Sequence, residues 1–134
     1  MYHVLNRANA RGQIFDDAGD YDAFERILGE GIERCGTRLL AWCVMPNHVH
    51  SLIEMVKGYS LGGILHSWKS YTAKKANRIL GRSGQFWDED YYDRYIRDDD
   101  HLRIAIGYIE QNPVKARLVT DATQWKYSSA RRRT

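Results

Sequence analysis

Cysteine is scarce in this chain, and its two copies, Cys35 and Cys43, stand eight positions apart. That spacing matches neither a zinc knuckle nor an even-numbered disulfide framework, so we interpret both as reduced, buried thiols. The sequence also lacks an apolar stretch long enough to span a bilayer, a secretory leader and a glycine-rich phosphate loop. These absences predict a cytoplasmic protein that has no membrane partner and needs no nucleotide cofactor.

The 134 residues are enough for one domain, which we place at 1–134, with a core that needs no disulfide or metal to hold it. The net charge is only +3, but the charges are unevenly distributed. Acidic residues gather at 16–33 and 88–100. Basic residues gather in one internal stretch and at the tail: Lys69, Lys74, Lys75, Arg78, Arg82, Arg131, Arg132 and Arg133. Such patches are typical of phosphate binding, and equally of an ordinary solvated surface.

The hydrophobic pattern predicts alternating strands and helices. Period-two alternation indicates strands, period 3.6 indicates amphipathic helices, and aspartate, glycine and proline mark their ends. We expect strands at 2–9, 37–45, 48–56 and 93–97, and helices from 16–20 to Gly36, from Ser60 to Gly81 and from Asp99 to Asn112, where Pro113 ends the last one. This order matches an α+β, ferredoxin-like β-α-β-β-α-β fold with an added C-terminal helix. We expect a four-stranded antiparallel sheet with helices on one face.

Two histidines flank one aliphatic residue in the stretch "MPNHVHSLIE", which begins at Met45. On a strand, His48 and His50 project from the same face, while Val49 points to the other. Neutral imidazoles can bind a metal, and a pair that lacks further cysteine or histidine partners fits Mg²⁺ or Mn²⁺ with added oxygen ligands. The alternative is two solvated histidines on an exposed sheet face.

The last predicted helix carries a second polar pair. Its apolar stripe is Leu102, Ala105, Ile106 and Ile109. Tyr108 and Asn112 are four residues apart, so they are neighbours on the helix surface beside that stripe. This pair could supply a phenol and an amide oxygen to a site, or it could be a boundary tyrosine followed by a helix terminator.

Several segments together resemble the single-tyrosine HUH transposases, most closely the REP-associated tyrosine transposases. They are "MPNHVHSLIE", "YIEQNPVKARLV" from Tyr108, "WKYSSARR" from Trp125, "YHVLNRANARGQIF" from Tyr2 and "SGQFWDEDYYDRYIR" from Ser83. The resemblance spans essentially the whole chain. It implies a protein with a ferredoxin-like fold, which cuts and rejoins single-stranded DNA at palindromic hairpins.

The resemblance also assigns roles to individual residues. It puts the HUH histidines at His48 and His50, the nucleophile at Tyr108 on the added helix, and the last metal ligand at Asn112, where some relatives carry glutamine. The implied reaction uses a divalent cation, forms a 5′-phosphotyrosine bond and needs no nucleotide. From the REP-associated branch we expect a bacterial, nucleoid-associated monomer rather than a homodimer.

The candidate DNA-binding residues are basic or aromatic. They lie near the end of the first strand, on the flank of the second helix and in the tail: Arg7, Arg11, Lys69, Tyr71, Lys74, Arg78, Arg82, Arg131 and Arg132. Charged grooves and stacking rings are what single strands require. Three tyrosines of the connector between the second and third predicted helices are expected to pack in the core or stack on bases: Tyr91, Tyr92 and Tyr95. His3, His66 and His101 are interpreted as structural or solvated.

Two other functions fit the same residues. A noncatalytic DNA-binding module would keep the fold and the basic surface but would not cut. A metal-dependent nuclease would use water as the nucleophile and an acid such as Glu54 as the base. Glu54 shares the strand face of His50, but four residues of strand put more than a dozen ångströms, at roughly 3.3 Å per residue, between them.

Overall fold

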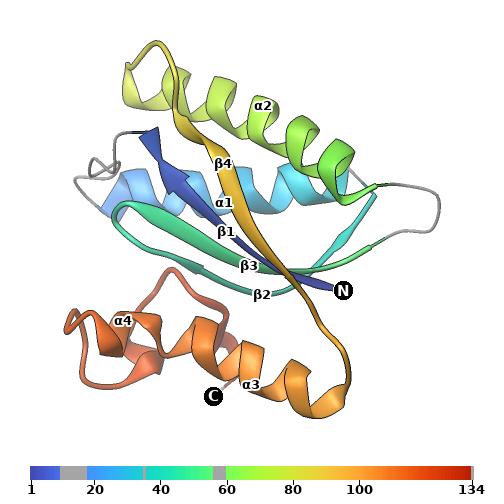
Figure 1. The fold of residues 1–134 in the computed structure, drawn as a ribbon. Helices are drawn as coiled ribbons and strands as arrows, with labels where there is room; N and C mark the ends of the chain where they lie inside the picture. The colour runs from blue at the N-terminus through green and yellow to red at the C-terminus, as the bar shows by residue number, and fades with distance from the viewer. Residues whose placement is uncertain (10–17, 35, 56–59, 134) are drawn as a thin grey trace.

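The computed structural model describes residues 1–9, 18–34, 36–55 and 60–133. Helices and strands alternate as the hydrophobic pattern predicts (Figure 1). The elements are β1 Tyr2–Ala8, α1 Ala18–Arg34, β2 Arg38–Val44, β3 His48–Glu54, α2 Leu61–Leu80, β4 Trp87–Tyr95, α3 Asp99–Glu110, α4 Asn112–Lys115, and the 3₁₀ turns η2 Ala122–Gln124 and η3 Ser129–Arg133. The aspartates at 16 and 17 that we expected to cap α1 lie outside the described residues.

The four strands form one antiparallel sheet in the order β2-β3-β1-β4. This is the strand order of a ferredoxin-like fold, so the predicted fold class is confirmed. β1 is central, and its Leu5 lies opposite His50 of β3 on one side and Tyr92 of β4 on the other. Residues directly opposite each other in an antiparallel sheet share a face, so these three side chains form one row.

Our expectation of helices on one face is wrong, because helices cover both faces (Figure 1). α1 and α2 pack on the face that carries Val49 and Ile53. α3 packs on the opposite face against Leu52 and Ala41. The reason is visible in β3, whose inner residues are buried on both faces, as expected for a strand between two layers.

The α1–α2 face has an aromatic core. Trp68 of α2 stacks on Trp87 of β4 with ring centroids 5.4 Å apart, and its indole nitrogen donates to the Leu28 carbonyl at 3.3 Å. Gly31 of α1 lies against the Trp68 ring, where an added Cβ would come within 2.8 Å of a ring carbon. Glycine at this position therefore allows the close approach of α1 and α2.

Two expected boundaries and one expected buried residue differ from the structure. β4 begins at Trp87 rather than Asp93, because the connector that we expected before it pairs with β1 across a register shift. The helical period predicts Ile79 on the buried stripe of α2, but this residue is 46% exposed at the end of the helix. α3 ends at Glu110, but Pro113 does not end the helical path; it lies in the first turn of α4, where a missing N–H costs nothing.

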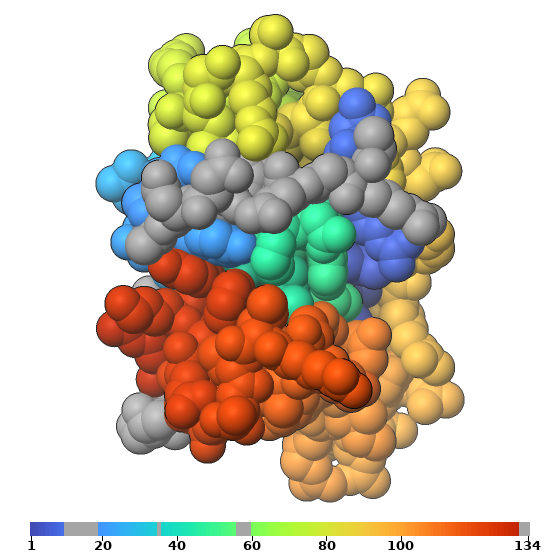
Figure 2. Space-filling model, turned by 90° about the vertical axis from the view of Figure 1, so that its left-hand side faces the viewer, coloured from blue at the N-terminus to red at the C-terminus, as the bar shows by residue number. Residues whose placement is uncertain are grey.

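The C-terminal segment fastens α3 to the sheet. The Val44 amide donates to the Tyr127 carbonyl at 2.8 Å, and the Trp125 indole donates to the Val44 carbonyl at 3.0 Å. Figure 2 shows this segment, coloured orange to red, below the green strands. The position of α3 is thereby fixed from both of its ends, by β4 before it and by this segment after it.

The sequence predicts reduced, buried cysteines and no membrane-spanning segment. Cys43 is fully buried and unpaired in the sheet, and burial raises the pKa of its thiol far above the usual range. Cys35 lies outside the described residues. Within the described ranges, each helix is too short or too polar to cross a bilayer.

Candidate active site

His48 and His50 project from the same face of β3, as the strand pattern predicts. Their ring centroids are 5.0 Å apart, and Val49 between them is fully buried on the opposite face. His50 is only 3% exposed, whereas His48 is half-buried near the Pro46–Asn47 turn. The interpretation of both as solvated surface histidines is therefore wrong for His50.

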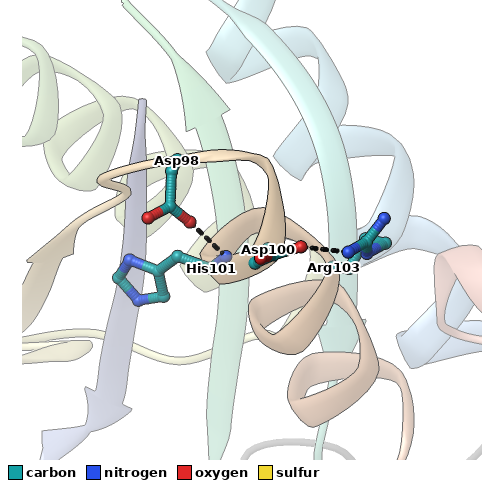
Figure 3. Close-up of polar contacts among 4 residues, drawn as sticks. All are labelled: Asp98, Asp100, His101 and Arg103. Carbon is teal, nitrogen blue, oxygen red and sulfur yellow. Dashed lines mark hydrogen bonds and ion pairs between the residues drawn. The ribbon is translucent and has the colours of Figure 1, made fainter.

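The start of α3 is set by an aspartate cap. The Asp98 carboxylate accepts a hydrogen bond from the His101 amide at 2.8 Å, and Asp100 pairs with Arg103 on the solvent side (Figure 3). In the same view the His101 ring points away from that ion pair. Capping and an acidic first turn both stabilise the positive end of a helix, so the helix starts here.

The helix brings Tyr108 and Asn112 to the histidines. The Asn112 side-chain amide lies 3.1 Å from His50 Nε2 and also hydrogen-bonds the His48 side chain. The Tyr108 ring centroid is 5.7 Å from that of His50, and the tyrosine is 46% exposed. A cavity of about 320 Å³ is lined by Leu5, Arg7, Asn47, His48, His50, Tyr108 and Asn112. The structure therefore gathers two pairs that are far apart in the sequence at one cavity.

His3 belongs to the same cluster, although the sequence pattern led us to interpret it as structural or solvated. Its Nε2 lies 3.0 Å from His50 Nδ1, and its ring is 5.7 Å from the Tyr108 ring. β1 pairs directly with β3, so alternate β1 residues share the face of the HUH pair. The signal that could have found His3 is its place two residues before Leu5 in a strand that pairs with the HUH strand. His66 is exposed on α2, as expected.

Burial keeps these imidazoles neutral. It lowers the pKa of His50 to about 3, with help from the neighbouring His48, His3 and Arg7. Burial also lowers the pKa of His48, opposed by its hydrogen bond with Asn112. Burial, followed by Arg94, lowers the pKa of His3. Neutral ring nitrogens are free to bind a metal or to exchange hydrogen bonds.

The residues present fit a divalent metal ion with open positions. His50 uses Nδ1 toward His3, which leaves Nε2 on the side of Asn112. Because the N and O of an amide side chain are assigned from hydrogen bonding, a turn of the Asn112 amide offers its oxygen to the same space. In the described ranges no group of three His, Cys, Asp or Glu side chains could hold a metal. A metal site here therefore depends on the Asn112 amide.

Positive charge surrounds the tyrosine. The Lys115 ammonium, from α4, lies 4.7 Å from the centre of the Tyr108 ring. Arg7 lies opposite His48 in the sheet and lines the same cavity. Lys115 is a second residue that the sequence pattern missed, because Pro113 hid the helical path that leads to it. These cations suit an anionic substrate such as a phosphodiester.

The basic flank of α2 lies on the other face of the sheet. Lys69 donates to the carbonyls of Asp88 and Glu89 at 2.7 and 2.9 Å, which ties α2 to β4. The Tyr71 hydroxyl donates to Glu30 at 3.2 Å, and the Arg34 guanidinium covers its ring.

The other candidate cations are distributed as follows. Lys74 and Arg78 are exposed along α2, Arg82 is exposed just after its C-terminal cap, and Arg131 is exposed in η3. Arg11 and the Arg132 side chain lie outside what the structure describes. Of the cations proposed to bind DNA, the structure therefore puts Arg7 at the histidine cavity.

Glu54, the base of the water-using alternative, is at the far end of β3. It accepts a hydrogen bond from Arg38 at 2.7 Å, across the strand pair. It is absent from the residues that line the histidine cavity. The water-using alternative therefore lacks the base that we assigned to it.

Comparison with known proteins shows the family of this chain. Residues 1–112 match the family model described as transposase, IS200-like. The chain belongs to the IS200-like transposase family. It is therefore an enzyme of the transposase class, which nicks and joins DNA, and the predicted family is confirmed.

Its relatives include REP-associated tyrosine transposases. A Haemophilus influenzae protein assigned that name is 29% identical over 125 residues, which cover 84% of this chain and 70% of the relative. The REP-associated tyrosine transposase of Escherichia coli is 22% identical over 131 residues, covering 98% of this chain and 76% of the relative.

Solved structures share the fold of this IS200-like chain. A REP-associated tyrosine transposase bound to a REP hairpin has a TM-score of 0.80 at 20% identity, covering 98% of this chain and 76% of that one. A Deinococcus radiodurans protein assigned as a transposase has a TM-score of 0.64 at 22% identity, covering 82% and 88%. At these identities the likeness supports the fold.

Proposed function

We propose that this transposase cuts and rejoins single-stranded DNA at palindromic, REP-like hairpins through a covalent bond to Tyr108. The observation that carries the proposal is the meeting of Tyr108 with the His50–Asn112 contact at one cavity. The hairpin substrate is suggested by relatives named REP-associated tyrosine transposases and by the hairpin bound in one of the similar structures. Arg7 at the cavity and the exposed cations of α2 would supply charge for the DNA backbone.

His48, His50 and Asn112 would hold a divalent cation, Mg²⁺ or Mn²⁺. When bound, such an ion neutralises charge on the phosphate oxygens in the transition state. The three side chains come from β3 and the start of α4, and the buried His50 gives the set one fixed member. No nucleotide cofactor enters the reaction.

His3 would act as a positioning residue for this set. If His50 Nε2 keeps its lone pair for a ligand, Nδ1 carries the proton and donates it to His3 Nε2 across 3.0 Å. A partner of this kind fixes both the tautomer and the orientation of a metal-binding imidazole. His3 would therefore raise the affinity of the metal site by acting through His50.

Tyr108 would supply the nucleophile. Its phenolic oxygen forms a bond to phosphorus as the bond from phosphorus to the 3′ oxygen breaks, which gives a 5′-phosphotyrosine and a 3′ hydroxyl. The phenol loses its proton and the leaving 3′ oxygen gains one, so the step balances without an oxidant or an energy source. The Lys115 ammonium, 4.7 Å from the centre of the Tyr108 ring, would attract the phosphate that the tyrosine attacks.

The same chemistry in reverse would join strands. A 3′ hydroxyl from another DNA end attacks the phosphotyrosine, restores a phosphodiester and frees Tyr108. Because the bond energy is retained in the protein–DNA link, joining needs no ATP. This is the difference between a transferase and a nuclease that uses water.

The test is a covalent trapping experiment. The protein is incubated with hairpin DNA from repeats that flank its own gene, with Mn²⁺ or Mg²⁺, and denatured before electrophoresis. We expect a protein–DNA adduct that disappears in Tyr108→Phe and in His50→Ala, with the folding of both variants checked by circular dichroism. Cleavage without an adduct would support the water-using nuclease. Tight binding without cleavage on any hairpin would support the noncatalytic module.

A further inference from the structure

A second cavity adjoins the proposed catalytic one. Its volume is about 480 Å³, within the range of ligand pockets. It lies between β1, β4 and α3, and it is lined by His3, Leu5, His50, Tyr92, Asp93, Arg94, Arg97, His101, Ile104, Ala105 and Tyr108. Leu5, His50 and Tyr108 line both cavities, so the two cavities adjoin.

The sheet wall of this second cavity follows from strand register. Leu5 lies opposite both His50 and Tyr92, and His3 lies opposite Arg94. These pairs make two rows on the face that carries the histidines. The aromatic and guanidinium groups of the wall are therefore fixed by the sheet rather than by a loop.

The helix wall is one face of α3. His101, Ile104, Ala105 and Tyr108 recur at steps of three and four residues, so they lie on one side of the helix. Ile104 is 70% exposed and Tyr92 is 61% exposed. With Tyr108, they are three of the six large hydrophobic side chains that are exposed among the described residues. Such a concentration of exposed apolar surface at one cavity indicates a ligand that covers it.

The side chains that line the second cavity have the chemistry to bind a nucleotide. Exposed aromatic rings and an aliphatic side chain suit the faces of a base, and Arg94 and Arg97 suit its phosphate. Asp93 is the one carboxylate in the lining, so cationic side chains outnumber it. The Arg7 guanidinium, which lines the catalytic cavity, lies 5.2 Å from the centre of the Tyr92 ring and joins the two sites.

We propose that this second cavity binds the nucleotide next to the scissile phosphate, with its base stacked on Tyr92 and Ile104. The inference rests on the proposed function, because it takes the scissile phosphate to lie in the catalytic cavity. Unpairing and stacking this nucleotide would hold the reactive bond in place beside Tyr108. The base that stacks best would then bias where the strand is cut.

The experiment is a coupling measurement between protein and DNA. Full-length protein carrying Tyr108→Phe, which blocks cutting, is titrated into a fluorescent hairpin with single-stranded flanks, and anisotropy gives the affinity. Each flanking nucleotide is replaced in turn by an abasic one. Tyr92→Ala, Tyr92→Phe and Tyr95→Ala are compared on every DNA.

We expect the effect of Tyr92→Ala to be coupled to the loss of the base at one DNA position only. Tyr92→Ala weakens binding by roughly 5- to 100-fold, the range for loss of one stacked base. An abasic nucleotide beside the scissile bond causes a similar loss, and the two changes together cause no more than either one. Tyr92→Phe keeps the ring and restores both the affinity and the sensitivity to the abasic position.

Tyr95→Ala is the matched control, because Tyr95 is 58% exposed on the same strand but packs edge-on against Tyr2 on the other face. It should leave the pattern unchanged. The assignment is wrong if the affinity losses from Tyr92→Ala and from an abasic nucleotide multiply at every flanking position. It is also wrong if Tyr92→Ala changes the affinity by less than about twofold. In a separate assay, the protein with Tyr108 unaltered is tested for adduct formation with the unmodified hairpin. An adduct without coupling refutes the nucleotide site alone, whereas the absence of both binding and adduct refutes the proposed function with it.

Discussion

On the α1–α2 face of the sheet, polar groups serve packing. The indole nitrogens of Trp68 and Trp87 donate to Leu28 and Thr72, and both rings are almost completely buried. On the α3 face, polar groups contact one another at the edge of solvent. His3, His50 and Asn112 form a chain of contacts of 3.0 and 3.1 Å beside two cavities.

The same strands supply both arrangements. β3 gives Val49 to one face and His50 to the other, and β1 gives Val4 and His3 in the same way. A central strand can therefore be buried on both faces, with apolar packing on one face and polar side chains beside a cavity on the other. Changes on the two faces should therefore separate stability from chemistry.

The largest effect is expected on the α3 face. His50→Ala should reduce adduct formation by roughly a thousandfold or more, because it removes both a proposed cation ligand and the partner of Asn112 and His3. The measurement is the rate of adduct formation at saturating hairpin DNA. His66→Ala, a histidine exposed on α2, is the control and should keep the full rate. Equal adduct rates for the two variants would contradict the assignment of the chemistry to the α3 face.

The next effect belongs to the α1–α2 face. Trp68→Ala should lower the free energy of unfolding by about 3–5 kcal/mol, because a fully buried indole leaves a cavity. Urea denaturation gives this value. At a temperature where the variant stays folded, its adduct rate should remain within about twofold of the unaltered protein. A large loss of rate in folded protein would show that the faces are coupled.

A smaller effect is expected for His3, which contacts the proposed metal ligand His50. His3→Ala should weaken Mn²⁺ binding by about 10- to 100-fold, because His50 loses the group that fixes its ring. Calorimetric titration of the protein without DNA measures the affinity independently of activity. His3→Gln, whose side-chain oxygen can accept from His50 Nδ1, should recover part of the affinity. Unchanged Mn²⁺ binding in His3→Ala would remove the positioning role.

The smallest effect is expected for the exposed cations of α2. Lys74→Ala combined with Arg78→Ala should weaken hairpin binding a few-fold and lower the slope of log affinity against log salt by up to about two. The adduct rate of the bound complex should not change, since these residues lie across the sheet from Tyr108. A salt slope identical to that of the unaltered protein would exclude them from the DNA interface.

Much of this arrangement could be predicted from local pattern. The alternation of β3 placed His48 and His50 on one face, and the four-residue step put Tyr108 and Asn112 side by side. The Ser60 cap and Gly81 fixed both ends of α2. These features depend on backbone geometry over a few residues, which sequence period reports directly.

The remaining features depend on contacts between distant segments. The partnership of His3 with His50 requires the register of β1 against β3, and the face chosen by α3 requires knowing that β3 is buried on both sides. The contacts of Tyr71 with Glu30 and Arg34 of α1 could not be predicted either, because these partners are some forty positions away. β4 starts early because residues from Trp87 onward pair with β1, and its acidic, aromatic sequence does not predict that pairing.

The most direct test of the central claim is to locate the covalent bond. The chain has nine tyrosines, and trypsin releases residues 104–115 with Tyr108 as their single tyrosine. After reaction with hairpin DNA, nuclease trimming and tryptic digestion, mass spectrometry should find the remaining nucleotide on that peptide. A nucleotide on a peptide that carries Tyr71 or Tyr92, or cleaved DNA with every tyrosine unmodified, would contradict the account.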